Sequence, residues 1–251
     1  MKLTFIGNGA MAKAMIAGLV NTHQIEVLGK DMVKLRALND AFGGKLSLGL
    51  LQEGVDVTGK TLLLCVKPHA LGAVSSYVQG EAHGLISVLA GTSLKALQEA
   101  FTCKHLIRAM PNLAAAHGAS MTLLTGDNDF RETSEAILKS IGKTHWLGTE
   151  KEFDIAMALT GSGPAFLALV AEALCDGVVR EGLKREDATF LARGLFEGFA
   201  PLLQANHPAL IKEAVMSPGG VTAAGLGALE DCKARSAFML AIKKTYEKTL
   251  K

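Results

Sequence analysis

Short apolar runs typical of β-strands alternate with segments that carry apolar residues at helical spacing through the first 148 residues of this 251-residue chain. The first run, residues 2–7, ends in glycine, and the helical pattern of residues 10–20 follows at once. Later strands are expected at residues 25–29, 61–66, 83–90, 104–110, 119–125 and 143–148, and helices at 31–42, 68–78, 93–101, 111–118 and 127–142. This alternation predicts an α/β fold with a mostly parallel sheet that helices cover on both faces.

The β-rich pattern ends near Gly148, and the rest of the chain is predicted to be helical. Helices are expected at residues 150–180 with a break at GSGP, at 185–205, at 209–215 and twice more after that. We therefore place a domain boundary after Thr149, with a first domain at 1–149 and an all-helical second domain at 150–251. Because the second domain is rich in alanine, leucine and glycine, its helices can pack closely. A second subunit is expected to cover some of its apolar faces in a homodimer.

Composition and charge exclude several classes of partner. The 26 basic and 24 acidic side chains leave a net charge of +2, which gives no field that favours nucleic acid or a membrane. The apolar run at the amino terminus is too short for a signal peptide, so a cytoplasmic location is expected. The longest apolar stretch, Ile155–Leu174, contains Glu172 and is interpreted as a helix buried against protein.

Cysteine and histidine show no pattern typical of a metal site, and no metal is expected. The seven histidines form no obvious pair with a carboxylate or a nucleophile. The cysteines lie tens of residues apart and match neither a zinc spacing nor a disulfide framework, so they are interpreted as reduced core thiols. They are Cys65, Cys103, Cys175 and Cys232.

The sequence GNGAMA, residues 7–12, follows the first strand directly and opens the first helix. Its G-x-G-x-x-A form suits the pyrophosphate of a dinucleotide, because Gly7 and Gly9 let the backbone come close while a helix amino terminus faces the anion. The alternative is that these glycines only make a tight turn. The place of the motif, at the start of a series of alternating units, favours dinucleotide binding.

The end of the second strand bears on the choice between NADPH and NADH. An acidic residue there would bind the ribose hydroxyls and repel a 2′-phosphate, but the strand ends in Gly29 and Lys30. Lys34 and Arg36 add positive charge, so NADPH is favoured and Lys30 is a candidate cofactor contact. Asp31 leaves NADH open, since its carboxylate could turn inward, and the basic residues could be a solvated helix face.

Two short motifs interrupt the regular pattern. CVKP, residues 65–68, ends a strand at the carboxyl edge of the sheet, where ligands lie in open α/β folds, so Lys67 and Pro68 are expected beside the cofactor. TGSGPAF, residues 160–166, places glycine and proline in a helical stretch, at a cost of about 1 and about 3 kcal/mol relative to alanine. Either a close backbone contact or a small ligand that needs exposed amides would offset that cost.

A later stretch, MSPGGVTAAGLGALE, combines a Pro-Gly-Gly sequence with a threonine before an alanine-rich helix. Ser217 is predicted to cap this helix, with Pro218 in its first turn. Gly219, Gly220 and Thr222 would then present amides and a hydroxyl that can hold a carboxylate. The alternative is a capped helix with flexible glycines.

On these motifs the chain closely resembles the 1-pyrroline-5-carboxylate reductase family over nearly its whole length. The resemblance rests on GNGAMA, CVKP, IRAMPN at 107–112, TGSGPAF and above all SPGGVTAAGLGALE at 217–230. It implies a Rossmann-type first domain and a helical second domain that forms an intertwined homodimer, sometimes assembled into a ring of dimers. It also implies a substrate site between the two domains, near the dimer interface.

The resemblance implies an activity and a set of site residues as well. NADPH or NADH would give hydride to the C=N carbon of 1-pyrroline-5-carboxylate and yield L-proline, the last step of proline synthesis. Ser217, Gly219 and Gly220 would hold the substrate carboxylate, and Thr222 would bond the ring nitrogen. The residues implied around the cofactor are Asn8, Ala10, Met11, Val66, Lys67, Pro68 and Asn112.

The chain departs from the family's usual sequence at three places. Val221 and Thr222 stand where two threonines are usual, and Leu-Ala-Ala follows MPN in place of threonine and proline. In TGSGPAF, Thr160 replaces a serine and Phe166 replaces a tyrosine. Thr160 keeps a hydroxyl, whereas Phe166 loses one.

Imine reduction needs a hydride at carbon and a proton on nitrogen, and the protonated imine is the better acceptor. Thr222 is therefore assigned an orienting role instead of that of a general acid. Two other classes stay open. A β-hydroxyacid dehydrogenase relative would carry a catalytic lysine soon after a glycine-rich segment, which GSGPAFLALVAEAL lacks. A catalytically silent NADP-binding regulator would bind cofactor without turnover.

Overall fold

The computed structural model describes residues 1–250, which divide into two compact units. Unit 1 contains residues 1–162 and the end of the last helix from Thr245 onward, and unit 2 contains residues 163–244. Thr149, where the predicted domain boundary falls, is the N-cap of helix α6 (Glu150–Thr160) in unit 1. The boundary stays a prediction.

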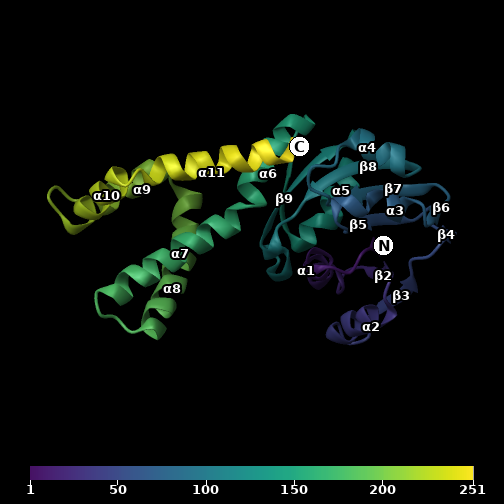
Figure 1. The fold of residues 1–251 in the computed structure, drawn as a ribbon, viewed down its shortest axis with the longest axis horizontal. Coiled ribbons are helices and arrows are strands. Elements are labelled where there is room, and N and C mark those ends of the chain that lie inside the picture. The colour runs from purple at the N-terminus through teal and green to yellow at the C-terminus, as the bar shows by residue number, and fades with distance from the viewer. Residues whose placement is uncertain (251) are drawn as a thin grey trace. The chain divides into compact units, whose positions relative to one another are not determined.

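Unit 1 is built on an eight-stranded sheet (Figure 1). The strands in this sheet are β1 (Lys2–Ile6), β2 (Gln24–Gly29), β3 (Leu46–Leu50), β5 (Thr61–Leu64), β7 (Ala82–Ser87), β8 (Cys103–Met110), β9 (Ser120–Gly126) and β10 (Gly142–Trp146). Their order is β10-β9-β8-β7-β5-β1-β2-β3, and every pair is parallel except β8 with β9. The predicted mostly parallel sheet is confirmed. Two short strands, β4 (Val55–Asp56) and β6 (Val78–Gln79), pair separately.

Helices cover both faces of this sheet. They are α1 (Ala10–Leu19), α2 (Met32–Ala41), α3 (Leu71–Ser75), α4 (Leu94–Ala100) and α5 (Arg131–Leu138), with 3₁₀ turns η1 (Pro68–Ala70), η2 (Leu113–His117), η3 (Asn128–Phe130) and η4 (Lys139–Ile141). The helix predicted at 68–78 is therefore much shorter, and the one predicted at 111–118 is a 3₁₀ turn. Ser75 and Ser76 donate to the carbonyls of Gly72 and Ala73 at 3.0 and 3.1 Å, and such local bonds compete with helix propagation.

Two hydrophobic cores result from the alternation of side chains along each strand. Phe5 and Leu63 lie in the core on the side of α1, α2 and α5, whereas Ile6 and Leu64 lie in the core on the side of α3 and α4. All four side chains are fully buried. Strands that bury both faces read as continuous apolar runs, which is why they were predictable.

The edge strand β3 was not predicted. It pairs with β2 alone, and its side chains range from Leu46, which is buried, to Leu50, which is 43% exposed. Its sequence contains Gly49, where a Cβ would approach the Leu28 side chain to 2.7 Å. A half-buried strand that contains glycine gives a weak sequence pattern.

Helix α6 is fastened to β8 by a buried arginine. The Arg108 guanidinium, with only 3% of its side chain exposed, lies 2.7 Å from Glu150 and 2.7 Å from Asp154. It also lies 4.6 Å from the centre of the Phe153 ring. Glu150 accepts a further bond from the Leu94 amide at 2.9 Å, so the start of α4 is tied to the same cluster.

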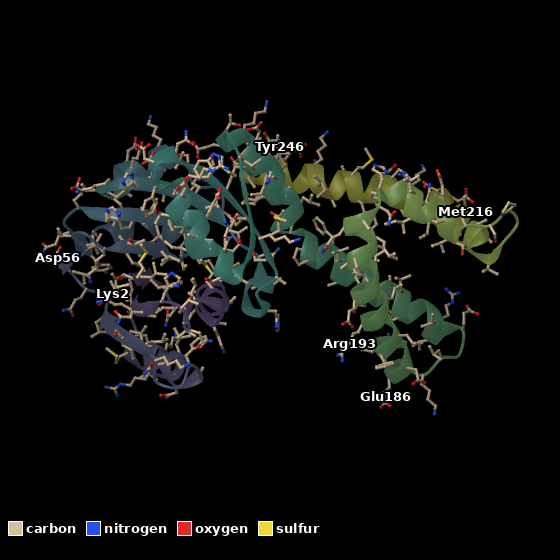
Figure 2. The ribbon with its side chains drawn as sticks, turned by 180° about the vertical axis from the view of Figure 1, so that it is seen from behind. Lys2, Asp56, Glu186, Arg193, Met216 and Tyr246 are labelled. Atoms are coloured by element: carbon tan, nitrogen blue, oxygen red, sulfur yellow. The ribbon has the colours of Figure 1, made fainter. Side chains whose placement is uncertain are left out.

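Unit 2 is helical, as predicted. Its helices are α7 (Gly163–Arg180), α8 (Arg185–Ala205), α9 (Pro208–Val215), α10 (Val221–Asp231) and most of α11 (Ala234–Thr249). Gly161 and Ser162 form a turn between α6 and α7, which confirms the predicted interruption of the helix. Met216 opens the loop that joins α9 to α10 (Figure 2).

The predicted start of α10 was wrong. The helix begins at Val221 with Gly220 as its N-cap, so Ser217 does not cap it and Pro218 lies outside its first turn. The reason is local, because Gly219 has φ +67° and turns the backbone out of the helical region just before Gly220.

Much apolar surface of the helical segments is exposed in the single chain. Residues Glu150–Arg180 are long and apolar enough to span a membrane by length and composition, which is weak evidence because core helices meet the same criteria. Only 17% of their apolar window is buried within the chain. The predicted burial of Ile155–Leu174 against protein would therefore need a second chain.

Candidate functional site

The GNGAMA turn follows β1, the strand from which successive connections run to opposite sides of the sheet. From β1 the chain moves outward to β2 and β3, and β5 then lies on the other side of β1. In open α/β sheets, ligands bind at this switch point, outside the carboxyl ends of the strands. Gly7 directly follows β1, and Cys65 directly follows β5.

Gly7 is needed for close packing of this turn. Its φ is +108°, and a Cβ at this position would lie 2.5 Å from the Cys65 carbonyl oxygen. Its amide donates to the Leu28 carbonyl at 2.9 Å, so the turn is bonded to the end of β2. Both the positive φ and the contact exclude any side chain here.

Gly9 serves a different purpose in the same turn. It is the N-cap of α1 with φ −77°, and no atom lies within 4 Å of the position a Cβ would take. The first turn of α1 contains no acidic residue. The amides of Ala10 and Met11 have no intrahelical acceptor by helix geometry, and both residues line the cavity described next, where an anion would be favoured.

A cavity of about 440 Å³ opens at this point of the sheet. It is lined by Gly7, Asn8, Gly9, Ala10, Met11, Cys65, Val66, Lys67, Pro68, His69, Ala70, Val88, Leu89 and Ala90. Eight of the residues predicted to contact the cofactor are in this set, from the GNGAMA turn and from CVKP. The structure thus brings these two motifs together in unit 1.

A second cavity of about 300 Å³ adjoins the first and shares Gly7, Asn8, Val66 and Ala70 with it. It is lined by Gly7, Asn8, Leu28, Gly29, Lys30, Asp31, Lys34, Leu51, Val66, Ala70 and Val74. Lys30 therefore lines the cavity beside the end of β2, and its predicted contact with the cofactor stays a prediction. In dinucleotide folds this end of the site takes the adenosine ribose.

The Asp31 carboxylate is occupied by its own helix. Its Oδ1 accepts from the amides of Val33 and Lys34 at 2.9 and 3.2 Å, and it forms an ion pair with Lys34 at 3.6 Å. The backbone amide of Lys34 is the largest cause that lowers the pKa of Asp31. The Asp31 carboxylate thus caps α2, although Asp31 also lines the second cavity.

Asn112 lines neither cavity. Its side chain accepts from the Ala114 amide at 3.0 Å and donates to the Thr160 carbonyl at 3.0 Å, which ties the loop after β8 to the end of α6. Its own amide donates to the Ser120 hydroxyl at 3.1 Å. A cofactor contact by Asn112 stays a prediction.

Several residues that line the cavities were not predicted. Val88, Leu89 and Ala90 follow β7, and Leu51 follows β3. The rule that ligands lie at carboxyl strand ends could have found the first three, because β7 was predicted. Leu51 was out of reach, since β3 itself was missed.

The loop before α10 has an unusual backbone. Gly219 adopts φ +67°, which favours glycine, and the Gly220 amide donates to the Ser217 carbonyl at 3.0 Å. The Gly220 amide is thus used inside the loop, contrary to the expectation that it is presented to a ligand. The first-turn amides of α10 follow directly, and helix geometry leaves them without intrahelical acceptors.

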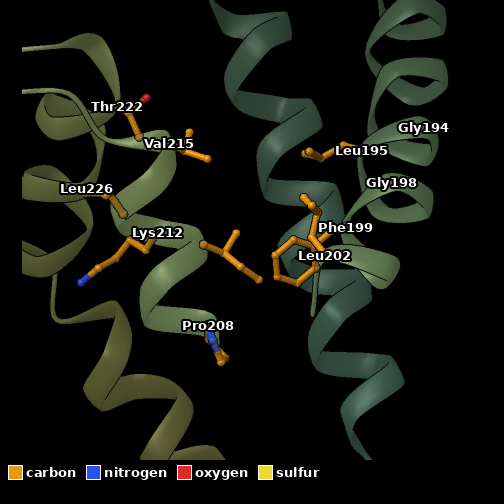
Figure 3. Close-up of a pocket in the computed structure, with 11 residues that line it drawn as sticks. Gly194, Leu195, Gly198, Phe199, Leu202, Pro208, Lys212, Val215, Thr222 and Leu226 are labelled. Carbon is orange, nitrogen blue, oxygen red and sulfur yellow. The ribbon is translucent and has the colours of Figure 1, made fainter. Parts of the chain in front are cut away.

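Thr222 lines an apolar cavity of about 620 Å³ within unit 2 (Figure 3). Leu195, Phe199 and Leu202 of α8 form one wall, and Val215 of α9 and Leu226 of α10 lie on the other side with Thr222. Within residues 1–250, the Thr222 hydroxyl makes no side-chain hydrogen bond. The predicted residues therefore form two groups, one in each unit.

The cysteines are free, as predicted, but they are not all core residues. Cys65 and Cys175 are buried, Cys103 is half-buried and Cys232 is exposed. Burial raises the pKa of the Cys65 thiol, so the residue beside Gly7 is an unreactive packing group. Among residues 1–250 no cluster of His, Cys, Asp or Glu could hold a metal ion.

The fold and these cavities define a class of protein, the nicotinamide-dependent oxidoreductases with a Rossmann-type domain followed by a helical domain. Comparison with known families agrees with this class. Residues 2–91 match the family model described as NADP oxidoreductase, coenzyme F420-dependent, and residues 150–251 match the one described as pyrroline-5-carboxylate reductase dimerisation.

Relatives of known identity resemble the chain over its full length. The pyrroline-5-carboxylate reductase of Synechocystis sp. is 37% identical to this chain, and the match covers 99% of this chain and 97% of the relative. The enzyme of Thermus thermophilus is 33% identical, and the match covers 97% of this chain and 95% of the relative. The crystal structure of the Streptococcus pyogenes enzyme superposes with a TM-score of 0.87 at 29% identity, covering 100% of this chain and 98% of the other. The chain belongs to the pyrroline-5-carboxylate reductase family.

Proposed function

We propose that this protein reduces 1-pyrroline-5-carboxylate to L-proline, with NADPH preferred over NADH as the hydride donor. One observation above all supports the proposal. The nucleotide turn GNGAMA and the family's loop SPGGVT occur in one chain whose full length resembles pyrroline-5-carboxylate reductases. Each of the two motifs precedes the amino terminus of a helix, where anions are stabilised.

The residues of unit 1 fit a nicotinamide dinucleotide. The open space next to Gly9 and the first-turn amides of α1 suit the pyrophosphate, and Lys67 adds an exposed positive charge to the same cavity. Lys30 follows the end of β2, and the neighbouring Asp31 carboxylate is engaged in capping α2, which together support NADPH. When bound, the nicotinamide supplies the hydride.

The residues of unit 2 fit a small amino-acid-like substrate. We assign the substrate carboxylate to Ser217, Gly219 and the first-turn amides of α10, because a carboxylate at a helix amino terminus is favoured by the aligned peptide dipoles. Gly220 shapes this loop, since a Cβ there would meet the Ser217 hydroxyl. Its amide is used within the loop, so its contribution is conformational.

Thr222 is assigned to the ring nitrogen. The reaction adds a hydride to the carbon of the protonated imine and gives a neutral amine, which then takes a proton from water, so no strong base is needed. The Thr222 hydroxyl can accept from the iminium N–H and hold the ring plane while the carbon is reduced. Leu195 and Phe199 form an apolar wall of the same cavity, and a second subunit that covered their exposed side chains would exclude water from it.

The experiment is a spectrophotometric assay of nicotinamide oxidation with 1-pyrroline-5-carboxylate, using wild type, Thr222→Val and Thr222→Ser. Valine keeps the volume of threonine but lacks its hydroxyl, so kcat should fall about 10- to 100-fold, which corresponds to roughly 1.5–3 kcal/mol. Thr222→Ser should retain most of the activity, and the KM for NADPH should stay near the wild-type value in both variants.

The alternatives give different results. No turnover of the imine by wild-type protein that binds NADPH would contradict the proposal and favour a regulatory NADP-binding protein. Turnover of a β-hydroxyacid in place of the imine would favour the dehydrogenase alternative. Equal kcat in wild type and Thr222→Val would remove Thr222 from the mechanism while leaving the overall reaction intact.

We further propose a homodimer formed through residues 150–251, with a ring of such dimers as the higher assembly. Support comes from the dimerisation family that these residues match and from the exposed apolar side chains of α7 and α8, such as Leu169 and Phe190. A cytoplasmic location is part of the proposal, because four free cysteines fit a reducing compartment.

A further inference from the structure

Tyr77 contacts Lys30 at the adenosine end of the nucleotide site. The Lys30 Nζ lies 4.6 Å from the centre of the Tyr77 ring, within the range of a cation–π interaction. The two residues come from different elements, since Lys30 directly follows β2 and Tyr77 follows α3. Tyr77 is not part of the family motifs described above.

The Tyr77 ring is held in place by packing on the core and by hydrogen bonds of its backbone. It is half-buried and packs on the core that contains Leu64 and Val74. Its amide donates to the Val74 carbonyl at 3.1 Å, and its carbonyl accepts from the Val55 amide at 3.0 Å. Val74 of this core also lines the second cavity, so the ring is fixed on the core that backs that cavity.

The charges around the second cavity leave Lys30 available to an anion. Lys34 is paired with Asp31 at 3.6 Å, and Asp31 is itself occupied by two backbone amides. Lys30 has no carboxylate partner in the part of the chain that the structure describes. A long lysine side chain loses rotamer freedom when it binds a ligand, and a side chain already held in place loses less.

We propose that Tyr77 is a positioning residue for cofactor selectivity, which holds Lys30 at the edge of the second cavity to bind the 2′-phosphate of NADPH. The proposal rests on the nicotinamide-dependent function proposed above. It assigns selectivity to a pair of residues, one at the end of β2 and the other after α3. The cation–π contact holds the Lys30 ammonium in place before the 2′-phosphate of NADPH binds. NADH has a neutral 2′-hydroxyl there, so its binding is not strengthened by this ammonium.

The test compares the binding of 2′,5′-ADP and 5′-AMP by isothermal titration calorimetry with the full-length chain. The dissociation constant of 5′-AMP divided by that of 2′,5′-ADP measures how much the 2′-phosphate contributes to binding. Lys30→Gln should reduce this ratio about 10-fold or more, because a charge-assisted contact is lost. Tyr77→Leu should reduce it about two- to fivefold, the range expected for loss of an exposed cation–π contact. Tyr77→Phe keeps the ring and should keep the wild-type ratio.

Three outcomes would overturn the proposal. Tyr77→Leu could retain the wild-type ratio, Lys30→Gln could retain it, or Tyr77→Leu could weaken both ligands equally, which would indicate a merely structural role. Thermal melts identify folded variants, and Tyr77→Met offers a second ring-free replacement. In the Lys30→Gln background, Tyr77→Leu should change the ratio no further, because the group it positions is gone.

Failure of this inference is distinguishable from failure of the proposed function. The binding ratios require no imine, so a protein that reduces 1-pyrroline-5-carboxylate but shows no effect of Tyr77→Leu would contradict the inference alone. A protein with the expected ratios but no turnover would contradict the function alone. In steady-state assays, Tyr77→Leu should raise the KM for NADPH with little change in kcat.

Discussion

Gly7 and Gly9 lie two residues apart in the nucleotide turn, yet they serve different purposes. Gly7 has φ +108° and lies against the Cys65 carbonyl, whereas Gly9 has ordinary φ and faces open space. One glycine is required by folding and the other by access of the ligand. The motif in the sequence does not separate these two roles.

Replacing each glycine by alanine should separate stability from binding. Gly7→Ala should lower the free energy of unfolding by at least about 2 kcal/mol, because its Cβ would meet backbone atoms at a strained φ. Gly9→Ala should cost less than about 1 kcal/mol but weaken NADPH binding, because its Cβ enters the space meant for the pyrophosphate. Urea denaturation and calorimetry measure the two effects, and equal stability losses would contradict the assignment.

Single residues also mark the limit of prediction from sequence. Ser217 looked like an N-cap because serine before proline is a common helix start, but Gly219 shifts the start to Val221. The cofactor contact of Asn112, implied by the family resemblance, stays a prediction, but nothing in the sequence indicated that its side-chain amide ties a loop to α6. In both cases the decisive fact is a backbone conformation or a long-range partner, which local sequence does not encode.

At the scale of elements, the ion cluster of Arg108 joins β8 to α6. The guanidinium is buried and bonded to Glu150 and Asp154, while its Nε has no partner among residues 1–250. A buried pair is weak evidence for net stability, but removal of one partner leaves charges without compensation. The cluster thus makes α6 an integral part of unit 1.

Arg108→Met should therefore lower the free energy of unfolding by about 3 kcal/mol. The matched control is Arg131→Met, which removes the more exposed pair between Arg131 and Glu135 and should cost less than about 1 kcal/mol. Equilibrium urea denaturation measures both variants. A loss below about 1 kcal/mol for Arg108→Met would contradict the structural role of the cluster.

Glu26 connects three strands and makes stability depend on pH. It accepts from Thr4 of β1 at 2.7 Å and from Lys60, just before β5, at 2.9 Å. Burial would raise the pKa of Glu26, but the bonds from Lys60 and Thr4 outweigh it and lower the pKa. A lowered pKa means that the stabilisation is present above the unfolded-state pKa and is lost as the pH falls through the folded-state pKa.

Glu26→Gln should cost about 1 kcal/mol at pH 7, because the charge-assisted bonds become neutral at a partly exposed site. The difference between wild type and variant should shrink once the pH falls below about 4.5, the ordinary carboxyl pKa. Urea denaturation between pH 7 and pH 3 measures it. A difference that stays constant over this range would show that the charge of Glu26 is not the cause.

At the scale of the whole molecule, the helical unit exposes apolar side chains to solvent. Leu195 is 57% exposed and Phe199 is 40% exposed, and both line the apolar cavity that Thr222 also borders. Exposed apolar surface of this kind marks an interaction site in a stable protein. The dimerisation family matched by residues 150–251 identifies a second copy as the expected partner.

Leu195→Asp should therefore weaken self-association at least about 10-fold, because a carboxylate would be buried without a partner in the dimer. The control is Val33→Asp on α2, a residue that is 77% exposed in unit 1 and should leave assembly unchanged. Light scattering after size-exclusion chromatography reports the mass of each variant. A wild-type mass for Leu195→Asp at micromolar concentration would place the interface elsewhere.

The sequence by itself determined the alternation of strands and helices apart from β3, β4 and β6, the change to an all-helical region near residue 150 and the two glycine-containing motifs before α1 and α10. These features depend on short-range periodicity and on glycine and proline, whose effects are local. Only the tertiary structure decided that Val88, Leu89 and Ala90 line the same cavity as GNGAMA and CVKP, that Asp31 caps α2 and that the Tyr77 ring contacts Lys30. These facts depend on contacts between segments far apart in the chain, which are set by packing of the sheet and not by any single stretch of sequence.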